Sequence, residues 1–95
     1  MATPLNPIAL PAQVLQAQAQ SVADRLTQQL LACLRQGGDA VLDASALSHF
    51  DSSALAVVLA CSRAVLAQGG QLRVQGLPAR AQALAQVYGV AELLA

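Results

Sequence analysis

Aromatic side chains and charges are both scarce in this chain of 95 residues. Phe, Trp and Tyr make up 2% of the sequence, whereas hydrophobic residues make up 56%. Charged residues contribute 11%, compared with about 25% in an ordinary soluble protein. The core must therefore consist of aliphatic side chains and alanine. We expect so weakly charged a domain to bury part of its surface against another protein; the alternative is a plain alanine-rich domain.

Lysine is absent, and the arginines are scattered along the sequence rather than clustered. The net charge is zero at pH 7. Because there is neither a basic stripe nor an aromatic stacking platform, we expect no binding to nucleic acid. The cysteines, Cys33 and Cys61, show neither CxxC nor Cys/His spacing. We interpret them as small buried side chains, with no disulfide, metal or other cofactor.

Long hydrophobic runs and a secretion signal are also missing. The longest apolar run, residues 54–61, is much shorter than the ~20 residues that span a bilayer. The first ten residues lack the positively charged start and the apolar stretch of a signal peptide. We therefore expect a cytoplasmic protein in which residues 1–95 form a single domain.

Prolines and glycines divide the chain into alternating elements. Prolines are frequent in residues 1–11, which predicts an irregular lead-in or an edge strand near residues 8–10. Helical periodicity predicts a helix from about residue 13 to Gly37. Strand patterns occupy residues 40–44 and 71–76, and a loop is predicted at 45–50. Helices are predicted over 52–68 and from Pro78 to Gly89, followed by a final turn or short helix at 90–94. This order predicts an α/β domain with a mainly parallel sheet of three or four strands, backed by helices.

The helix predicted over residues 52–68 is apolar on nearly every side. One stripe, expected to face the sheet, consists of Leu55, Val58, Leu59, Ser62 and Leu66. Ala54, Ala56, Val57, Ala60 and Cys61 make its other sides apolar too. A helix that is apolar all round is covered on more than one side. The second cover is either a partner protein or the neighbouring helices of the same domain.

Three polar residues, Asp51, Ser52 and Ser53, stand where this helix begins. The first N–H groups of a helix lack intrahelical acceptors, and one of these side chains is expected to cap them. The surplus hydroxyl is then exposed at a position that favours an anion, including a phosphate on the serine itself. The charge of Asp51 opposes such an anion. His49 is a further, weaker candidate.

Catalysis has little support in the sequence. A serine nucleophile needs a base within hydrogen-bond reach, and side chains adjacent in sequence, such as His49, Asp51 and Ser52, seldom reach that geometry. The chain also has no GxSxG elbow, no phosphate-binding glycine loop and no metal-ligand cluster. We therefore expect that the protein is not an enzyme.

Three segments together resemble one family. Residues 40–56 (AVLDASALSHFDSSALA) and 69–78 (GGQLRVQGLP) resemble the core of STAS domains, which occur in sulfate-transporter tails and in bacterial anti-sigma-factor antagonists. Residues 84–94 (LAQVYGVAELL) look most like the small STAS subunit of Mla-type phospholipid-transport ABC complexes. The resemblance covers roughly residues 39–94.

The resemblance implies a cytoplasmic accessory subunit, peripheral to the inner membrane, that binds an ABC ATPase and through it a permease. It would support the assembly and activity of a transporter that maintains outer-membrane lipid asymmetry. The residues expected to contact the partner are Asp51, Ser52, Ser53, Leu55 and Ala56. In anti-sigma-factor antagonists the hydroxyl after the Asp is the phosphorylation site. Ser52 occupies that position here, so the resemblance also implies the alternative of a phosphorylation-regulated antagonist.

The sequence departs from the family pattern at two places. STAS domains usually open with a β-hairpin, whereas residues 1–11 leave room for one short strand, so the hairpin is expected to be truncated. Anti-sigma-factor antagonists typically carry glycine where Ala54 and Ala56 stand. Alanine favours helix and a packed protein contact. A homodimer that uses the same apolar face is a third hypothesis.

Overall fold

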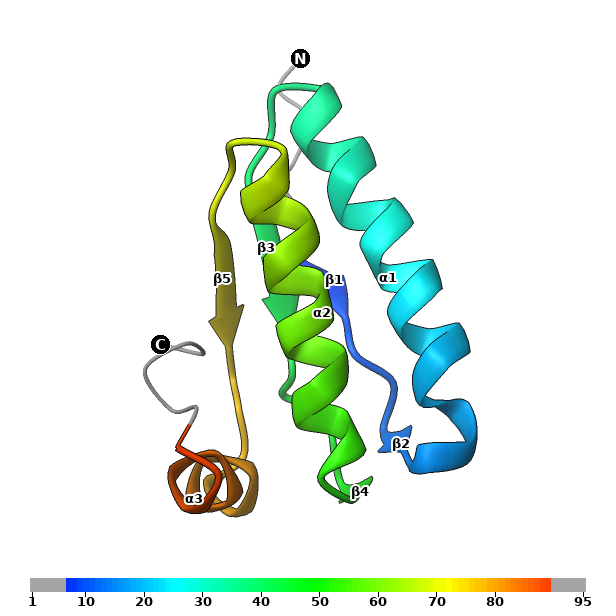
Figure 1. Cartoon of the computed structure of the whole chain (residues 1–95), viewed down its shortest axis with the longest axis vertical. Helices are drawn as coiled ribbons and strands as arrows, with labels where there is room; N and C mark the ends of the chain where they lie inside the picture. Colours follow the sequence, from blue (N-terminus) through cyan, green and yellow to red (C-terminus); the bar gives the residue numbers. More distant parts are fainter. Residues whose placement is uncertain (1–6, 90–95) are drawn as a thin grey trace.

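A computed structural model describes residues 7–89, in which short strands alternate with helices (Figure 1). The elements are β1 (Ile8–Ala9), β2 (Gln13–Val14), α1 (Gln16–Arg35), β3 (Ala40–Asp43), β4 (His49–Phe50), α2 (Ser53–Ala67), β5 (Leu72–Gln75) and α3 (Ala79–Val87). The turn or short helix predicted at residues 90–94 lies outside the described residues.

The main sheet has three parallel strands in the order β1-β3-β5. Leu42 on the central strand pairs with Ile8 on one side and with Val74 on the other. Because neighbouring parallel strands need a crossover, α1 and α2 are the connections between them. The predicted α/β class with a small parallel sheet is confirmed. The edge strand predicted near residues 8–10 is β1.

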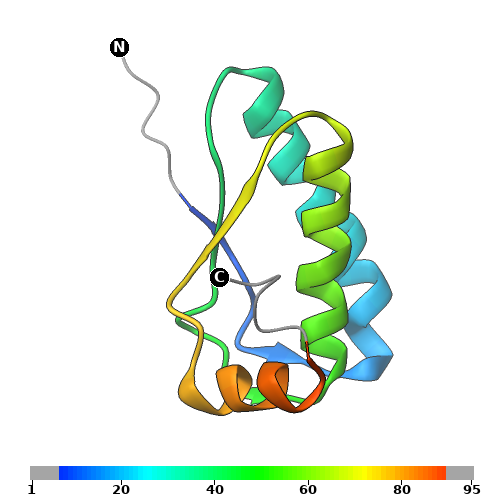
Figure 2. The same ribbon diagram turned by 60° about the vertical axis from the view of Figure 1, so that its left-hand side comes forward.

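Both long helices cover the same face of this sheet, and α3 crosses the ends at which the strands finish (Figures 1 and 2). The most extensive contact between elements joins α1 to α2. No polar or charged residue is buried among residues 7–89. The predicted aliphatic core is confirmed, except that the aromatic Phe50 is also buried. The largest fully buried side chains of the core are Leu10, Leu26, Leu30, Leu42, Val14, Val57, Val58, Val65 and Cys61.

Glycines end the two long helices, as the sequence predicts. Gly37 and Gly69 have φ values of 83° and 81°, in the left-handed region that glycine adopts without a steric penalty. Each donates its N–H to a carbonyl of the last helical turn: Gly37 to Leu34 at 3.0 Å and Gly69 to Leu66 at 2.9 Å. These turns return the chain to β3 and β5.

The cysteines lie in helices, as predicted, but differ in burial. Cys61 on α2 is buried, and its Sγ atom lies 3.8 Å from the Oγ1 atom of Thr27 on α1. Burial raises the pKa of this thiol. Cys33 is half-buried, and both cysteines are free. The prediction of a buried side chain is therefore correct for Cys61 and only partly so for Cys33.

Two predicted boundaries are wrong. Residues 45–50, predicted to be a loop, contain the short strand β4, which pairs in parallel with β2. Val14, assigned to the first helix by its periodicity, lies in β2 instead, and α1 begins at Gln16. A strand of two residues has too few positions for its alternation to be recognised in sequence. This small pair matters because it leads directly into the candidate site.

Candidate functional site

Asp51 lies between β4 and α2, and its carboxylate holds the first turns of two helices. Its Oδ1 atom accepts a hydrogen bond from the backbone N–H of Ser53 at 2.8 Å. Its Oδ2 atom accepts one from the backbone N–H of Gln16, the first residue of α1, at 3.3 Å. Both donors belong to helix starts that lack intrahelical acceptors. One carboxylate therefore caps α1 and α2 together.

The β2–β4 pair brings Asp51 to this position. Val14 lies beside Phe50 in the ladder, and the backbone N–H of Asp51 donates to the Val14 carbonyl at 3.4 Å. Leu15, which precedes α1, has no side-chain oxygen that could cap it, so the acceptor comes from the distant segment. The N–H and hydroxyl of Ser53, with a smaller contribution from the N–H of Gln16, lower the pKa of Asp51.

With Asp51 as the cap, Ser52 is left facing solvent. Its backbone is already helical, with φ −63° and ψ −15°, and its side chain does not cap α2. The Ser52 residue is exposed, whereas Ser53 is half-buried. His49 is exposed on β4. The three polar residues thus divide into a structural carboxylate and an accessible hydroxyl at the head of α2.

The buried side of α2 differs from the stripe predicted in sequence. Leu59 and Ser62 are only half-buried, and Leu66 is 59% exposed. The prediction that these three face the sheet is therefore wrong for Leu66 and only partly correct for Leu59 and Ser62. α1 covers a second side of α2, which agrees with the alternative of cover from the same domain. The residues of α2 that are buried are Ala54, Leu55, Val57, Val58, Cys61 and Val65.

A continuous line of side chains remains uncovered within the described structure, and we name it the α2 outer face. It consists of Ser52, Ala56, Leu59, Arg63 and Leu66, at spacings of three and four residues that place them on one side of a helix. Leu59 is half-buried and the other four are exposed. Apart from Ser52 at its head and Arg63, this face is apolar.

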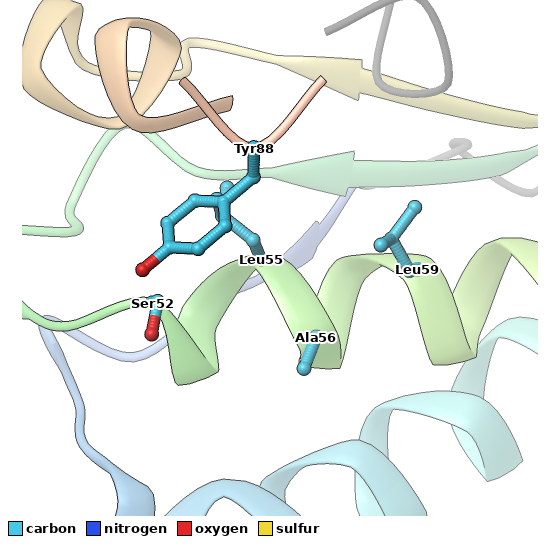
Figure 3. Close-up of a pocket in the computed structure, with 5 residues that line it drawn as sticks. All are labelled: Ser52, Leu55, Ala56, Leu59 and Tyr88. Carbon is cyan, nitrogen blue, oxygen red and sulfur yellow. The ribbon is translucent and has the colours of Figure 1, made fainter. Parts of the chain in front are cut away.

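Tyr88 extends the α2 outer face beyond its own helix. It follows α3 and is 58% exposed, and its neighbour Val87 is 80% exposed. The apolar periodicity of the helix predicted from Pro78 to Gly89 places Tyr88 on the same face as Ala81, Leu84 and Ala85. Its exposure shows that this prediction is wrong for Tyr88. Figure 3 shows its ring above Leu55, with the hydroxyl directed toward the Ser52 end of α2.

A shallow hollow of about 300 Å³ lies between Tyr88 and α2. Its lining is Ser52, Leu55, Ala56, Leu59 and Tyr88. Three of the five residues predicted to contact a partner therefore line one depression. Leu55 is 5% exposed and forms the floor of the hollow. A partner therefore contacts Leu55 only by entering the hollow. Asp51 and Ser53 stabilise the helix start beside it.

Sequence reasoning missed Leu59, Arg63, Leu66 and Tyr88 as members of this surface. The first three follow Ser52 at helical spacing, so a projection of the helix from the exposed serine would have found them. Tyr88 has no such signal, because its place depends on how α3 crosses the end of the sheet.

The described residues offer few groups for chemistry. Within residues 7–89 there is no cluster of three His, Cys, Asp or Glu side chains that could hold a metal ion. None of the helices in this part of the chain is long and apolar enough to cross a membrane. What the site presents is an apolar surface that begins at a hydroxyl group.

The fold and this surface define a small parallel α/β domain with one uncovered helix face. A family model described as "Mlab, STAS domain" matches residues 14–95. The chain therefore belongs to the STAS domain family, and the matched model agrees with the resemblance to Mla-type subunits. A search of curated proteins finds no match.

Proposed function

We propose that this chain is a non-catalytic accessory subunit of an Mla-type ABC phospholipid transporter. It binds the ATPase subunit on the cytoplasmic side of the inner membrane and supports assembly and activity of the complex, which maintains outer-membrane lipid asymmetry. The description of the matched family supports the Mla-type assignment. The scarcity of groups for chemistry in the described residues supports a binding role.

The α2 outer face and the adjacent Tyr88 are the observation that carries this proposal. Isolated apolar residues are ordinary on a protein surface, whereas a contiguous apolar patch is typical of a protein contact. Here Leu59 and Tyr88 line a hollow, and the exposed Leu66 lies farther along the same side of α2. Ser52 stands at the head of this patch, where a partner group can accept or donate a hydrogen bond.

Substitution of Ser52 by Arg tests the proposal. The longer, charged side chain fills the hollow and blocks close approach of the ATPase, so we expect co-purification with the ATPase and lipid transport to be lost. Ser21→Arg is the matched control, because Ser21 is an exposed serine on α1. Both variants should unfold at the wild-type temperature. Unchanged ATPase binding by Ser52→Arg would count against the proposal.

A second candidate function rests on the exposed hydroxyl of Ser52 alone. In an anti-sigma-factor antagonist this serine is phosphorylated by a partner kinase. The position at a helix start favours a phosphate, but Asp51 already occupies the adjacent N–H groups with a negative charge. Incubation with the cognate kinase, followed by mass spectrometry with Ser52→Ala as the control, decides between the two. Absence of phosphate removes this candidate.

A further inference from the structure

Arg63 is the only charged residue in α2, and it lies within the α2 outer face. It follows Ala56 and Leu59 at helical spacing and precedes Leu66 by three residues. Its guanidinium therefore emerges from the middle of an apolar strip, not from its polar edge. A partner that covers Leu59 and Leu66 must also cover the base of Arg63.

The acidic side chains in the described part of the chain belong to other segments. Asp24 lies on α1, Asp43 ends β3, and Asp39 precedes that strand. Asp51 is nearest in sequence, but both of its oxygens already accept backbone hydrogen bonds. α2 itself has no acidic residue between Ser53 and Ala67. Arg63 therefore meets no carboxylate along its own helix.

Covering a guanidinium without a partner is costly, because an ionised group loses its water shell and gains no hydrogen bond in return. A planar guanidinium is matched best by a carboxylate, which accepts two parallel hydrogen bonds. A second copy of this chain, docked through the same face, brings another Arg63 and no unengaged carboxylate on α2. Charge complementarity therefore favours a different protein over a second copy.

We propose that the ATPase partner carries an acidic residue opposite Arg63, flanked by apolar side chains that cover Leu59 and Leu66. This inference rests on the proposed function and deepens it. The apolar strip supplies contact area, and the ion pair fixes the position of the partner along the length of α2. Ser52 and Arg63 are then two separate anchors, three helical turns apart, of which the family resemblance pointed only to the first.

Binding of the purified cognate ATPase, measured by calorimetry, tests this inference. We expect Arg63→Gln to weaken the affinity about tenfold and Arg63→Glu about a hundredfold, because the second change adds repulsion to the loss of the pair. The difference between wild type and Arg63→Gln should shrink between about 50 mM and about 500 mM salt, since screening weakens the pair. Arg73→Gln is the matched control: Arg73 is an exposed arginine on β5.

The outcomes separate this inference from the proposed function. If wild type fails to bind the ATPase, both are overturned. A second outcome is that wild type binds the ATPase, that Ser52→Arg fails to bind, and that both Arg63 variants bind as tightly as wild type at low salt. In that case the docking surface is supported and the acidic contact opposite Arg63 is overturned. If instead wild type forms a dimer that Arg63→Gln dissociates in light scattering, a carboxylate of a second copy is the partner of Arg63 and the inference also fails. Unfolding temperatures equal to wild type show that the variants are folded.

Discussion

Asp51 shows how a residue singled out for function can have a structural task. Its two oxygens hold the start of α2 through Ser53 and the start of α1 through Gln16. The carboxylate interacts favourably with the positive ends of both helices, and these interactions need its ionised form. The accessible group at the site is therefore Ser52, and Asp51 sets the position of the helix that presents it.

The lowered pKa of Asp51 predicts acid sensitivity. In the unfolded chain the pKa of an Asp is about 3.9. The folded pKa of Asp51 is lower, so the folded state holds this proton less tightly. The stabilisation from Asp51 is then complete above the unfolded pKa and is lost as the pH falls through the lower, folded pKa. Asp51→Asn keeps one acceptor but no charge. We expect it to lower the unfolding temperature at pH 7 and to flatten the decline between about pH 4 and pH 2.

Calorimetric unfolding scans across that pH range are the measurement. Asp43 is the carboxylate with which Asp51 is compared. Hydrogen bonds from the N–H and, to a smaller extent, the hydroxyl of Ser45 lower the pKa of Asp43, but this side chain caps no helix. Asp51→Ala, which removes both acceptors, should be less stable than Asp51→Asn at every pH. A wild-type acid profile in the Asp51→Asn protein would show that this carboxylate makes no net contribution to the stability of the two helix ends.

At the scale of elements, α2 places adjacent residues in different environments, one in the core and the next in solvent. Val65 is fully buried and Leu66 is 59% exposed. Val65→Ala removes buried methyl groups and leaves a cavity, so we expect a loss of about 2 kcal/mol in the free energy of unfolding. Leu66→Ala should change the free energy of unfolding by less than about 0.5 kcal/mol, while it weakens the binding of the partner. Urea denaturation measures both; equal losses would contradict the observed orientation of α2.

Features of the fold that depend on residues close together in sequence were predictable, whereas features that depend on contacts between distant segments were not. Gly37 and Gly69 act on their own helix ends, and alternation along residues 72–75 marks β5, so these elements were found. The orientation of α2 was not, since apolar periodicity selects no face of a helix that is apolar on all sides. Only the polar residues Ser52 and Arg63 mark its exposed face. The contact from Asp51 to Gln16 needs the β2–β4 pair, which joins segments far apart in sequence. The hydroxyl of Ser52 was correctly expected to be exposed, whereas the exposure of Tyr88 depends on the path of α3.

For the molecule as a whole, the net charge and the exposed apolar surface together determine whether copies of the chain associate. The net charge is zero at pH 7 and the isoelectric point is about 6.5, so little repulsion separates copies in solution. In the absence of a partner protein, the α2 outer face adds a weak apolar contact between copies that does not depend on Arg63. We expect the mass measured by light scattering to rise above 9.7 kDa with concentration at the isoelectric point and to fall back at about pH 9, where the chain is negatively charged.

Leu66→Gln is the variant that identifies the surface responsible. It removes an exposed apolar side chain and should reduce the association at the isoelectric point, whereas Arg73→Gln, on another element, should leave the apolar contact intact. A mass of one chain at all concentrations would mean that the α2 outer face does not associate with itself. An association that is unaffected by Leu66→Gln would place the contact elsewhere on the molecule.

The central position of β3 also governs when this domain can fold. Leu42 pairs with Ile8 and with Val74, and a whole helix separates it from each partner along the chain. No hairpin in the described sheet is available as a local nucleus, and parallel pairing of distant segments is slow. During synthesis, β3 has an open edge until residues 72–75 have left the ribosome. A chain interrupted after α2 would expose that edge to other nascent chains, so translation must pass β5 before the protein is protected from aggregation.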